Sequence, residues 1–98
     1  MARKTTELTL VIPTFNEEKQ IGKTINSIVA YLKNQKLNIE LLVIDDSRDK
    51  TYDILKNLAR KYKILKVMHR TGGEGVGSAI RLGINKAEGK YIIIFIYQ

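Results

Sequence analysis

The sequence predicts an α/β fold, in which a parallel sheet is covered by helices on both faces. Four short apolar segments, rich in β-branched residues, alternate along the chain with three segments whose apolar residues recur at helical spacing. The apolar segments show no polar alternation, which indicates strands that are buried on both faces. Such strands, separated by amphipathic helices, are typical of a parallel sheet between two helical layers.

The first strand is expected at residues 8–13 (LTLVIP), followed by a helix that places Ile21, Ile25 and Val29 on one face. The last helix is expected to end at Gly89, a residue type that favours the position just after a helix. The remaining elements are expected, in chain order, as a strand at residues 39–44, a helix at about 50–62, a strand at 64–68 and a strand at 91–97.

Right-handed crossovers between these strands favour a half-Rossmann arrangement with strand order 3-2-1-4. In such sheets, ligands bind beyond the carboxyl ends of the strands, at the switch between the first and fourth strands. The residues that directly follow each strand are therefore the candidates for a functional site.

Composition excludes several kinds of site. The 98 residues contain no cysteine and a single histidine, His69, so neither a disulfide, a thiolate metal site nor a histidine cluster can form.

Residues 1–6 are polar and do not resemble a signal peptide. The apolar runs are far shorter than the roughly 18 residues that span a bilayer. We therefore expect a cytoplasmic location.

The net charge is +7, and eight of the 17 basic residues fall between Arg48 and Arg70. Such a concentration attracts phosphates, nucleic acid or an anionic membrane face, although a solvated helix face is an equally good interpretation. Nucleic acid is disfavoured as a partner, because no stripe of basic residues interleaved with aromatic ones is present.

Polar residues follow the first strand. Thr14 and Glu17 have the spacing of a capping box, and capping would account for Thr14 and Asn16 completely. Capping requires neither Pro13 before them nor an aromatic residue at Phe15, whereas a pocket that stacks a base would use both. Both interpretations remain open.

The second strand leads into Asp45 and Asp46, two adjacent carboxylates that repel each other where ordinary turn chemistry needs only one. Ser47 or Asp49 can cap the following helix. Asp45 is then the functional candidate, because a carboxylate at this edge can accept from a base N–H or a ribose hydroxyl. A metal role would need further oxygen ligands.

A glycine-rich segment, residues 70–78, lies between the third strand and the third helix, where a backbone nest can hold phosphate. It lacks the Gly-Lys-Ser/Thr of a Walker A loop, and Ser78 departs from the dinucleotide-binding fingerprint. A flexible loop is the alternative. A response-regulator fold is disfavoured, because Met68 and His69 stand where its acceptor aspartate belongs.

Taken together, three ordered motifs resemble family 2 glycosyltransferases of the GT-A fold, especially the polyprenol (dolichyl) phosphate mannosyl- and glucosyltransferases. The motifs are VIPTFNEEKQIGKTI, VIDDSRDKTYDIL and GxGSAIRLGINKAEG, and they cover nearly the whole chain. The resemblance implies a nucleotide-sugar site for a GDP- or UDP-linked sugar. It places Asp45 against the base and Arg70 near the sugar and phosphates. The nucleotide-binding residues that it implies are Pro13, Thr14, Phe15, Glu17, Asp45, Asp46 and Arg70.

The chain departs from the family at the fourth strand. Enzymes of the family bind Mg²⁺ or Mn²⁺ through an Asp-x-Asp motif there, and this chain has Ile96, Tyr97 and Gln98 at those positions. The acceptor-binding half of the family is also missing. We therefore expect residues 1–98 to be a single, truncated nucleotide-sugar-binding domain that is incomplete for catalysis alone, with a lipid-phosphate acceptor at a membrane face.

A second hypothesis is a non-catalytic assembly module that keeps the fold. Its basis is the fourth strand, which would form an exposed apolar edge. Such an edge predicts a homodimer or larger oligomer joined through residues 91–97.

Overall fold

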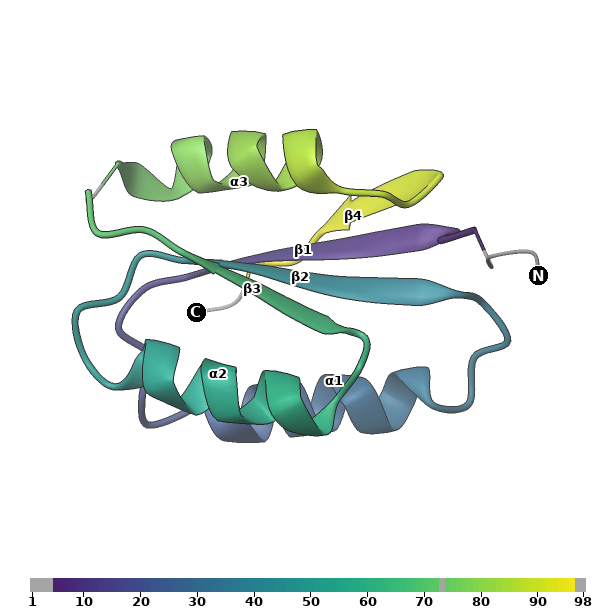
Figure 1. Ribbon diagram of the computed structural model, residues 1–98, viewed down its shortest axis with the longest axis horizontal. Coiled ribbons are helices and arrows are strands. Elements are labelled where there is room, and N and C mark those ends of the chain that lie inside the picture. The colour runs from purple at the N-terminus through teal and green to yellow at the C-terminus, as the bar shows by residue number, and fades with distance from the viewer. Residues whose placement is uncertain (1–4, 73, 97–98) are drawn as a thin grey trace.

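A computed structural model of the chain describes residues 5–72 and 74–96. They form four strands and three helices in alternation (Figure 1). None of the described helices has both the length and the apolar character needed to cross a membrane. The elements are β1 (Leu8–Thr14), α1 (Ile21–Leu32), β2 (Ile39–Asp45), α2 (Thr51–Lys61), β3 (Leu65–His69), α3 (Gly75–Lys86) and β4 (Tyr91–Ile94).

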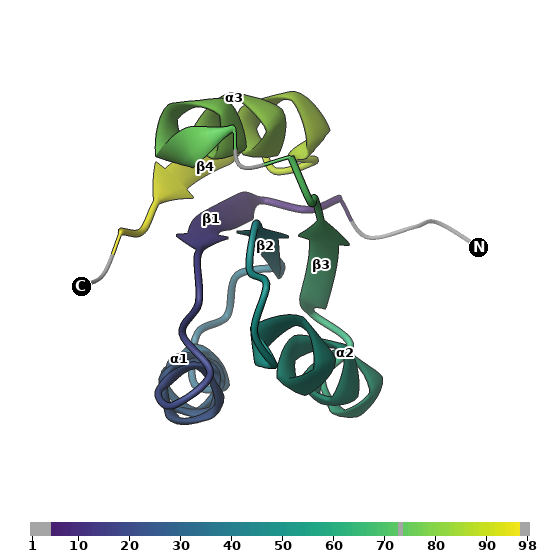
Figure 2. The ribbon, with the colours of Figure 1, turned by 90° about the vertical axis from the view of Figure 1, so that its left-hand side faces the viewer.

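The strands form one parallel sheet in the order β3-β2-β1-β4, which confirms the predicted fold class and topology. Figure 2 views the sheet from the side where the strands end. It shows α1 and α2 together beneath the sheet and α3 above it. The carboxyl ends of β1, β2 and β3 therefore lie at one edge, together with the start of α3.

Two apolar layers hold the helices to the sheet. Ile12, Leu41 and Val43 face α1 and α2, whereas Val11 and Leu42 face α3. Every residue of β2 is buried, as expected for a central strand covered on both faces. Because successive strand residues point to opposite faces, odd-numbered positions of β2 face α1 and α2 and even-numbered positions face α3.

Helix α3 ends at Lys86 with Ala87 as its C-cap, so Gly89 lies one residue beyond the C′ position that was expected for it. The backbone N–H of Glu88 donates to the Glu40 carboxylate, and that of Gly89 donates to the Thr9 hydroxyl. These N–H groups are bound by the sheet instead of the helix. Gly89 is required for close approach, because a Cβ there would lie 2.5 Å from the backbone nitrogen of Thr9.

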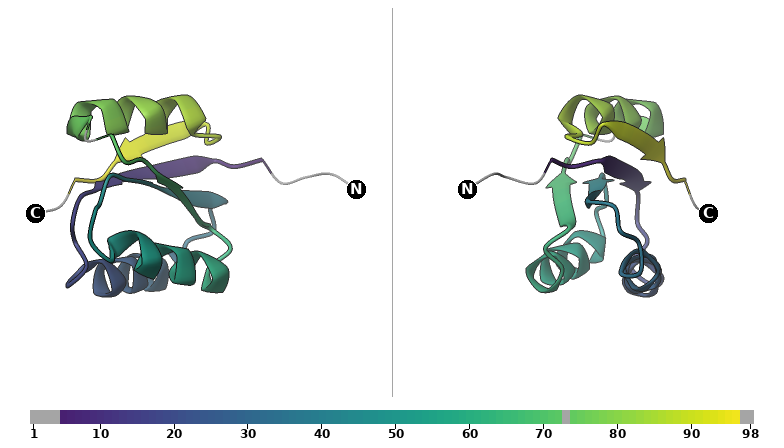
Figure 3. Two further views of the ribbon diagram at one scale, coloured as in Figure 1. Left: turned by 60° about the vertical axis from the view of Figure 1, so that its left-hand side comes forward. Right: turned by 90° about the vertical axis from the view of Figure 1, so that its right-hand side faces the viewer.

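Strand β4 forms an open edge of the sheet (Figure 3). It ends at Ile94 and is shorter than the expected 91–97, of which residue 97 lies outside the described part of the chain. Tyr91 and Ile93 are 64% and 51% exposed. The expected apolar edge is therefore present.

Glu40 is a buried carboxylate at the opposite end of the sheet from the strands' carboxyl termini. It accepts the Thr9 hydroxyl at 2.6 Å, the Glu88 N–H at 2.7 Å and the Lys66 ammonium at 3.0 Å. Burial by itself raises the pKa of Glu40, but these hydrogen bonds outweigh it, and its pKa lies below the ordinary 4.5. Glu40 thus ties β1, β3 and the α3–β4 connection to β2.

Replacing Glu40 with Gln should lower the free energy of unfolding at neutral pH by about 1–3 kcal/mol, because the charge-assisted bonds are lost. A carboxyl whose pKa is lowered on folding stabilises the fold above its unfolded pKa, and this contribution is lost as the pH falls below about 4.5. Denaturant unfolding measured across pH should therefore show that the free energies of unfolding of the wild type and of Glu40→Gln converge in acid. Glu88→Gln, which changes a 64%-exposed side chain, is the control. A constant difference between wild type and Glu40→Gln across this range would contradict the assignment.

Candidate functional site

A pocket of about 670 Å³ opens at the edge where the strands end, on the α3 side of the sheet. We call it the edge pocket. It lies next to the switch between β1 and β4, where the topology predicts a ligand. Its walls come from the β1–α1 loop, the segment after β2, the first turns of α3 and Ile96, which follows β4. The lining residues are Pro13, Thr14, Phe15, Asn16, Glu17, Asp46, Arg48, Gly75, Val76, Ala79 and Ile96.

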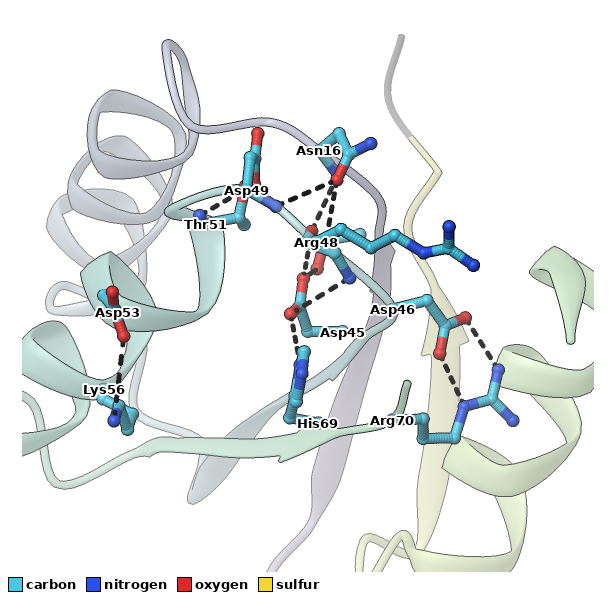
Figure 4. A network of polar contacts seen from close by, with 12 residues as sticks. Asn16, Asp45, Asp46, Arg48, Asp49, Thr51, Asp53, Lys56, His69 and Arg70 are labelled. Carbon is cyan, nitrogen blue, oxygen red and sulfur yellow. Dashed lines mark hydrogen bonds and ion pairs between the residues drawn. The ribbon is translucent and has the colours of Figure 1, made fainter. Parts of the chain in front are cut away.

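The Asp45 carboxylate lies beside this pocket, fully buried, at the centre of a network that joins three strand ends (Figure 4). Its Oδ1 accepts the hydroxyls of Thr14 and Ser47, each at 2.6 Å. Its Oδ2 lies 3.3 Å from the Ser47 nitrogen and 2.8 Å from Nδ1 of His69. Thr14 and His69 stand directly opposite Asp45 in the sheet register. A buried charge needs such donors, because without them its desolvation is very costly.

The β1–α1 turn depends on the same network. Asn16 adopts a left-handed backbone with φ of 49°, a conformation that asparagine tolerates better than most residues. Its N–H donates to the Ser47 hydroxyl at 2.7 Å, and its Oδ1 accepts the Arg48 N–H at 2.8 Å. The turn leaves Phe15 58% exposed in the pocket wall.

The capping interpretation of Thr14 and Asn16 is therefore wrong. Helix α1 begins only at Ile21, after Gln20, and among the described residues no side chain caps it. Tertiary partners, which local spacing does not reveal, bind both residues. The N–H of Glu17 instead donates to the hydroxyl of Thr51 at 2.8 Å, at the start of α2.

Asp49 receives the N–H and the hydroxyl of Thr51 at 2.9 and 2.6 Å. The N-cap position of α2 is Lys50, and among the described residues no side chain caps this helix, so the expectation that Ser47 or Asp49 caps it is wrong. Asp49 also accepts the N–H of Glu18 at 3.4 Å. Desolvation raises the pKa of Asp49, but the hydrogen bonds from Thr51 and Glu18 lower it further than burial raises it. The loops after β1 and β2 are therefore bound to each other along their length.

Asp46 points away from Asp45 and makes a bidentate ion pair with Arg70. Arg70 Nε and Nη2 each lie 2.7 Å from a carboxylate oxygen of Asp46, and Nη1 donates to the Ser78 hydroxyl at 2.8 Å. Hydrogen bonding to Asp46 raises the pKa of Arg70 above its ordinary value, against the opposing effect of burial. The pair fixes the β3–α3 connection to the end of β2.

The two adjacent carboxylates thus avoid repulsion by facing opposite sides of the sheet, each with its own cation or donors. Asp46 lies on the α3 side and lines the pocket, whereas Asp45 lies on the α2 side and does not. Arg70 stands behind Asp46 and outside the pocket lining. Of the seven sequence-predicted residues, the pocket collects Pro13, Thr14, Phe15, Glu17 and Asp46.

Arg48 is a pocket residue that sequence reasoning did not single out. Its guanidinium is exposed and extends across the opening, and within the described chain no hydrogen bond or ion pair engages it (Figure 4). The pocket mouth also holds Gly75, whose φ is 88°, at the start of α3. An unpaired cation next to the positive end of a helix suits an anionic ligand. The expected phosphate nest in residues 70–78 includes residue 73, which lies outside the described residues.

The described residues do not by themselves fit a Mg²⁺ or Mn²⁺ site. Ile96 occupies the first position where the family has Asp-x-Asp, and Tyr97 and Gln98 lie outside the described chain. Across residues 5–72 and 74–96, no group of three His, Cys, Asp or Glu side chains is placed to hold a metal.

Comparison with known proteins gives a family match along most of the chain. The model of the family described as "Glycosyl transferase family 2" matches residues 9–95. Dolichol-phosphate mannosyltransferase of Pyrococcus furiosus is 34% identical over 89 residues, which cover 90% of this chain and 24% of the relative. Dolichyl-phosphate beta-glucosyltransferase of Homo sapiens is 33% identical over 98 residues, which cover 92% of this chain and 30% of the relative.

Solved structures share the fold. The mannosyltransferase PcManGT of Pyrobaculum calidifontis, solved with GDP-Man and Mn²⁺, has a TM-score of 0.80 at 22% identity over 95% of this chain and 28% of its own. TarS 1-349 of S. aureus, solved with UDP-GlcNAc, has a TM-score of 0.77 at 27% identity over 92% of this chain and 26% of its own. The chain spans about a quarter to a third of the length of these proteins.

Asp45→Asn should lower the free energy of unfolding by about 2–4 kcal/mol, because the amide brings a donor against groups that already donate. Denaturant unfolding measures this change. The matched control is Asp53→Asn on α2, whose side chain is 72% exposed and should change stability by about 0.5 kcal/mol or less. If both variants change stability equally, Asp45 does not hold the strand ends together.

Proposed function

The chain belongs to glycosyl transferase family 2, and from this premise we propose that its edge pocket binds the nucleoside diphosphate of a GDP- or UDP-linked sugar. The observation that carries this proposal is an exposed aromatic ring, Phe15, which shares a pocket at the strand ends with the carboxylate of Asp46. The structure of TarS with UDP-GlcNAc, at 27% identity, supports this class of ligand.

The pocket offers each kind of contact that binding of a nucleoside requires. Phe15 presents a ring face for stacking, while Pro13 and Val76 add apolar walls. The Asp46 oxygens retain acceptor capacity beside their bonds to Arg70, and they can accept a base N–H or a ribose hydroxyl. In this arrangement Asp46 contacts the nucleoside, and Asp45, which the resemblance places against the base, holds the loop that carries Phe15.

The diphosphate would lie toward the pocket mouth, where Arg48 supplies a free guanidinium. Arginine binds phosphate oxygens through two parallel N–H groups, which gives both attraction and orientation. The start of α3 adds a weaker positive potential on the same side. Arg70 acts indirectly, because its guanidinium is already committed to Asp46.

We propose that this chain supplies the donor-binding part of a sugar transferase. Ile96, Tyr97 and Gln98 stand where the family has its Asp-x-Asp motif, so transfer would require further chain or a second polypeptide. The dolichyl-phosphate and dolichol-phosphate transferases among the relatives support a lipid-phosphate acceptor at a membrane face.

Titration calorimetry with GDP, UDP and their sugar conjugates should detect weak, saturable binding by the whole chain. Phe15→Ala should weaken it by about 1–3 kcal/mol, because base stacking is lost, which corresponds to about a 5- to 150-fold increase in Kd. The control is Tyr31→Ala, which removes a 70%-exposed aromatic ring from α1, outside the edge pocket. An absence of heat with every nucleotide at millimolar concentration would refute the proposal.

The exposed edge favours a second candidate function, in which the chain is an assembly module that oligomerises through β4. An unpaired parallel edge strand offers backbone donors and acceptors to another chain. Ile93, half exposed on this strand, adds apolar surface. Both functions can coexist, because β4 and the edge pocket use different groups.

Sedimentation should then show self-association that rises with concentration. Ile93→Lys should abolish it, because a charge on the edge strand opposes pairing. Ile84→Lys on α3 is the matched control, since Ile84 and Ile93 are 47% and 51% exposed. A clean monomer at high concentration would exclude the assembly function.

A further inference from the structure

We propose that His69 is a positioning residue for the edge pocket, acting through Asp45 on the loop that carries Phe15. This inference rests on the proposed nucleotide site, and it concerns a residue that does not line the pocket. His69 ends β3 with its side chain 20% exposed, on the α2 side of the sheet.

The hydrogen bonds around Asp45 define which nitrogen of His69 carries a proton. Oδ1 of Asp45 accepts two hydroxyls, from Thr14 and Ser47, and Oδ2 faces the Ser47 N–H. A carboxylate only accepts, so Nδ1 of His69, 2.8 Å from Oδ2, must donate. The geometry therefore assigns a proton to Nδ1.

A second contact holds the His69 ring in this orientation. The ring stacks on Tyr52 of α2 with centroids 4.1 Å apart and planes 7° from parallel. The ammonium of Lys56 lies 4.8 Å from the centroid of the Tyr52 ring. Because the ring plane is fixed, Nδ1–H is aimed at one oxygen of Asp45, and the carboxylate cannot rotate freely.

Carboxylate orientation is transmitted to the pocket through two hydroxyls. Asp45 Oδ1 orders Thr14, whose neighbour in the chain is Phe15, and it orders Ser47, whose oxygen receives the Asn16 N–H at 2.7 Å. Loss of the His69 donor would leave Oδ2 under-bonded and free to compete for the Ser47 hydroxyl. The left-handed turn at Asn16 would then lose its anchor, and Phe15 would no longer be held in the pocket wall.

Two substitutions separate hydrogen bonding from packing. His69→Phe keeps an aromatic ring against Tyr52 and removes the donor. His69→Asn loses the ring and can place its amide N–H near the position of Nδ1. Asn26→Ala, which removes the hydrogen bond between Asn26 and Tyr62 across α1 and α2, is a control for general loss of stability. Calorimetry with UDP and with GDP gives Kd, and denaturant unfolding gives stability.

We expect His69→Phe to raise Kd about 5- to 20-fold, His69→Asn to restore it to within about 3-fold of wild type, and Asn26→Ala to leave it unchanged. Wild-type affinity in His69→Phe, or equal losses in the Phe and Asn variants, would overturn the proposal.

Nitrogen NMR of the free protein tests the inference without a nucleotide. The imidazole of His69 should show the Nδ1–H form at neutral pH, and His69→Phe should shift the amides of Phe15 and Asn16 more than His69→Asn does. An Nε2–H imidazole, or unmoved amides, would refute the inference even if nucleotide binds. If nucleotide does not bind but these NMR results hold, the proposed function fails and the positioning role stands.

Discussion

The burial of one carboxylate, Asp45, is the constraint on which the functional edge of this protein depends. A fully buried charge destabilises a fold unless donors surround it, and here they come from β1, from the segment after β2 and from β3. Satisfying Asp45 therefore requires three strand ends to be in register. The same bonds order the loops that follow β1 and β2, which form much of the pocket.

Strand β2 applies the same principle at both of its ends. Glu40 binds the amino ends of β1 and β3 and the α3–β4 connection, whereas Asp45 binds the carboxyl ends. Between them the strand is entirely buried and apolar. Asp46, one residue on, faces the opposite side and reaches the pocket with Arg70 behind it. The period of two along a strand thus separates a structural carboxylate from one that is available to a ligand.

Hydrophobic pattern was sufficient to predict the fold class, the strand order and the edge at which the pocket lies. Strands that are apolar on both faces permit few arrangements, and right-handed crossovers favour the order that the structure has. Local spacing was a poor guide to polar residues. Thr14 and Asn16 matched a capping pattern, yet their partners lie more than 30 positions away, at the end of β2 and on the segment that follows it.

Sequence reasoning used His69 to exclude a histidine metal cluster and to disfavour a response-regulator fold. Its partnership with Asp45 becomes visible once the strands are paired in register. Likewise, Asp45 and Asp46 could have been separated by counting alternation along β2 from its apolar residues. The choice of Asp45 as the ligand-facing carboxylate stays a prediction, for which the geometry offers Asp46 as the better-placed candidate. The role of Gly89 could not be predicted, because it depends on close approach to Thr9, a residue far away in sequence.

The central claim is that the edge pocket is a nucleotide site held in place by a buried carboxylate network. The most direct test is an amide NMR titration of the chain with UDP and with GDP. The account predicts saturable shifts concentrated at Phe15, Asn16, Asp46 and Val76, with residues of α1 such as Tyr31 unmoved. Saturable shifts that avoid this pocket, or no shifts with either nucleotide at millimolar concentration, would contradict it.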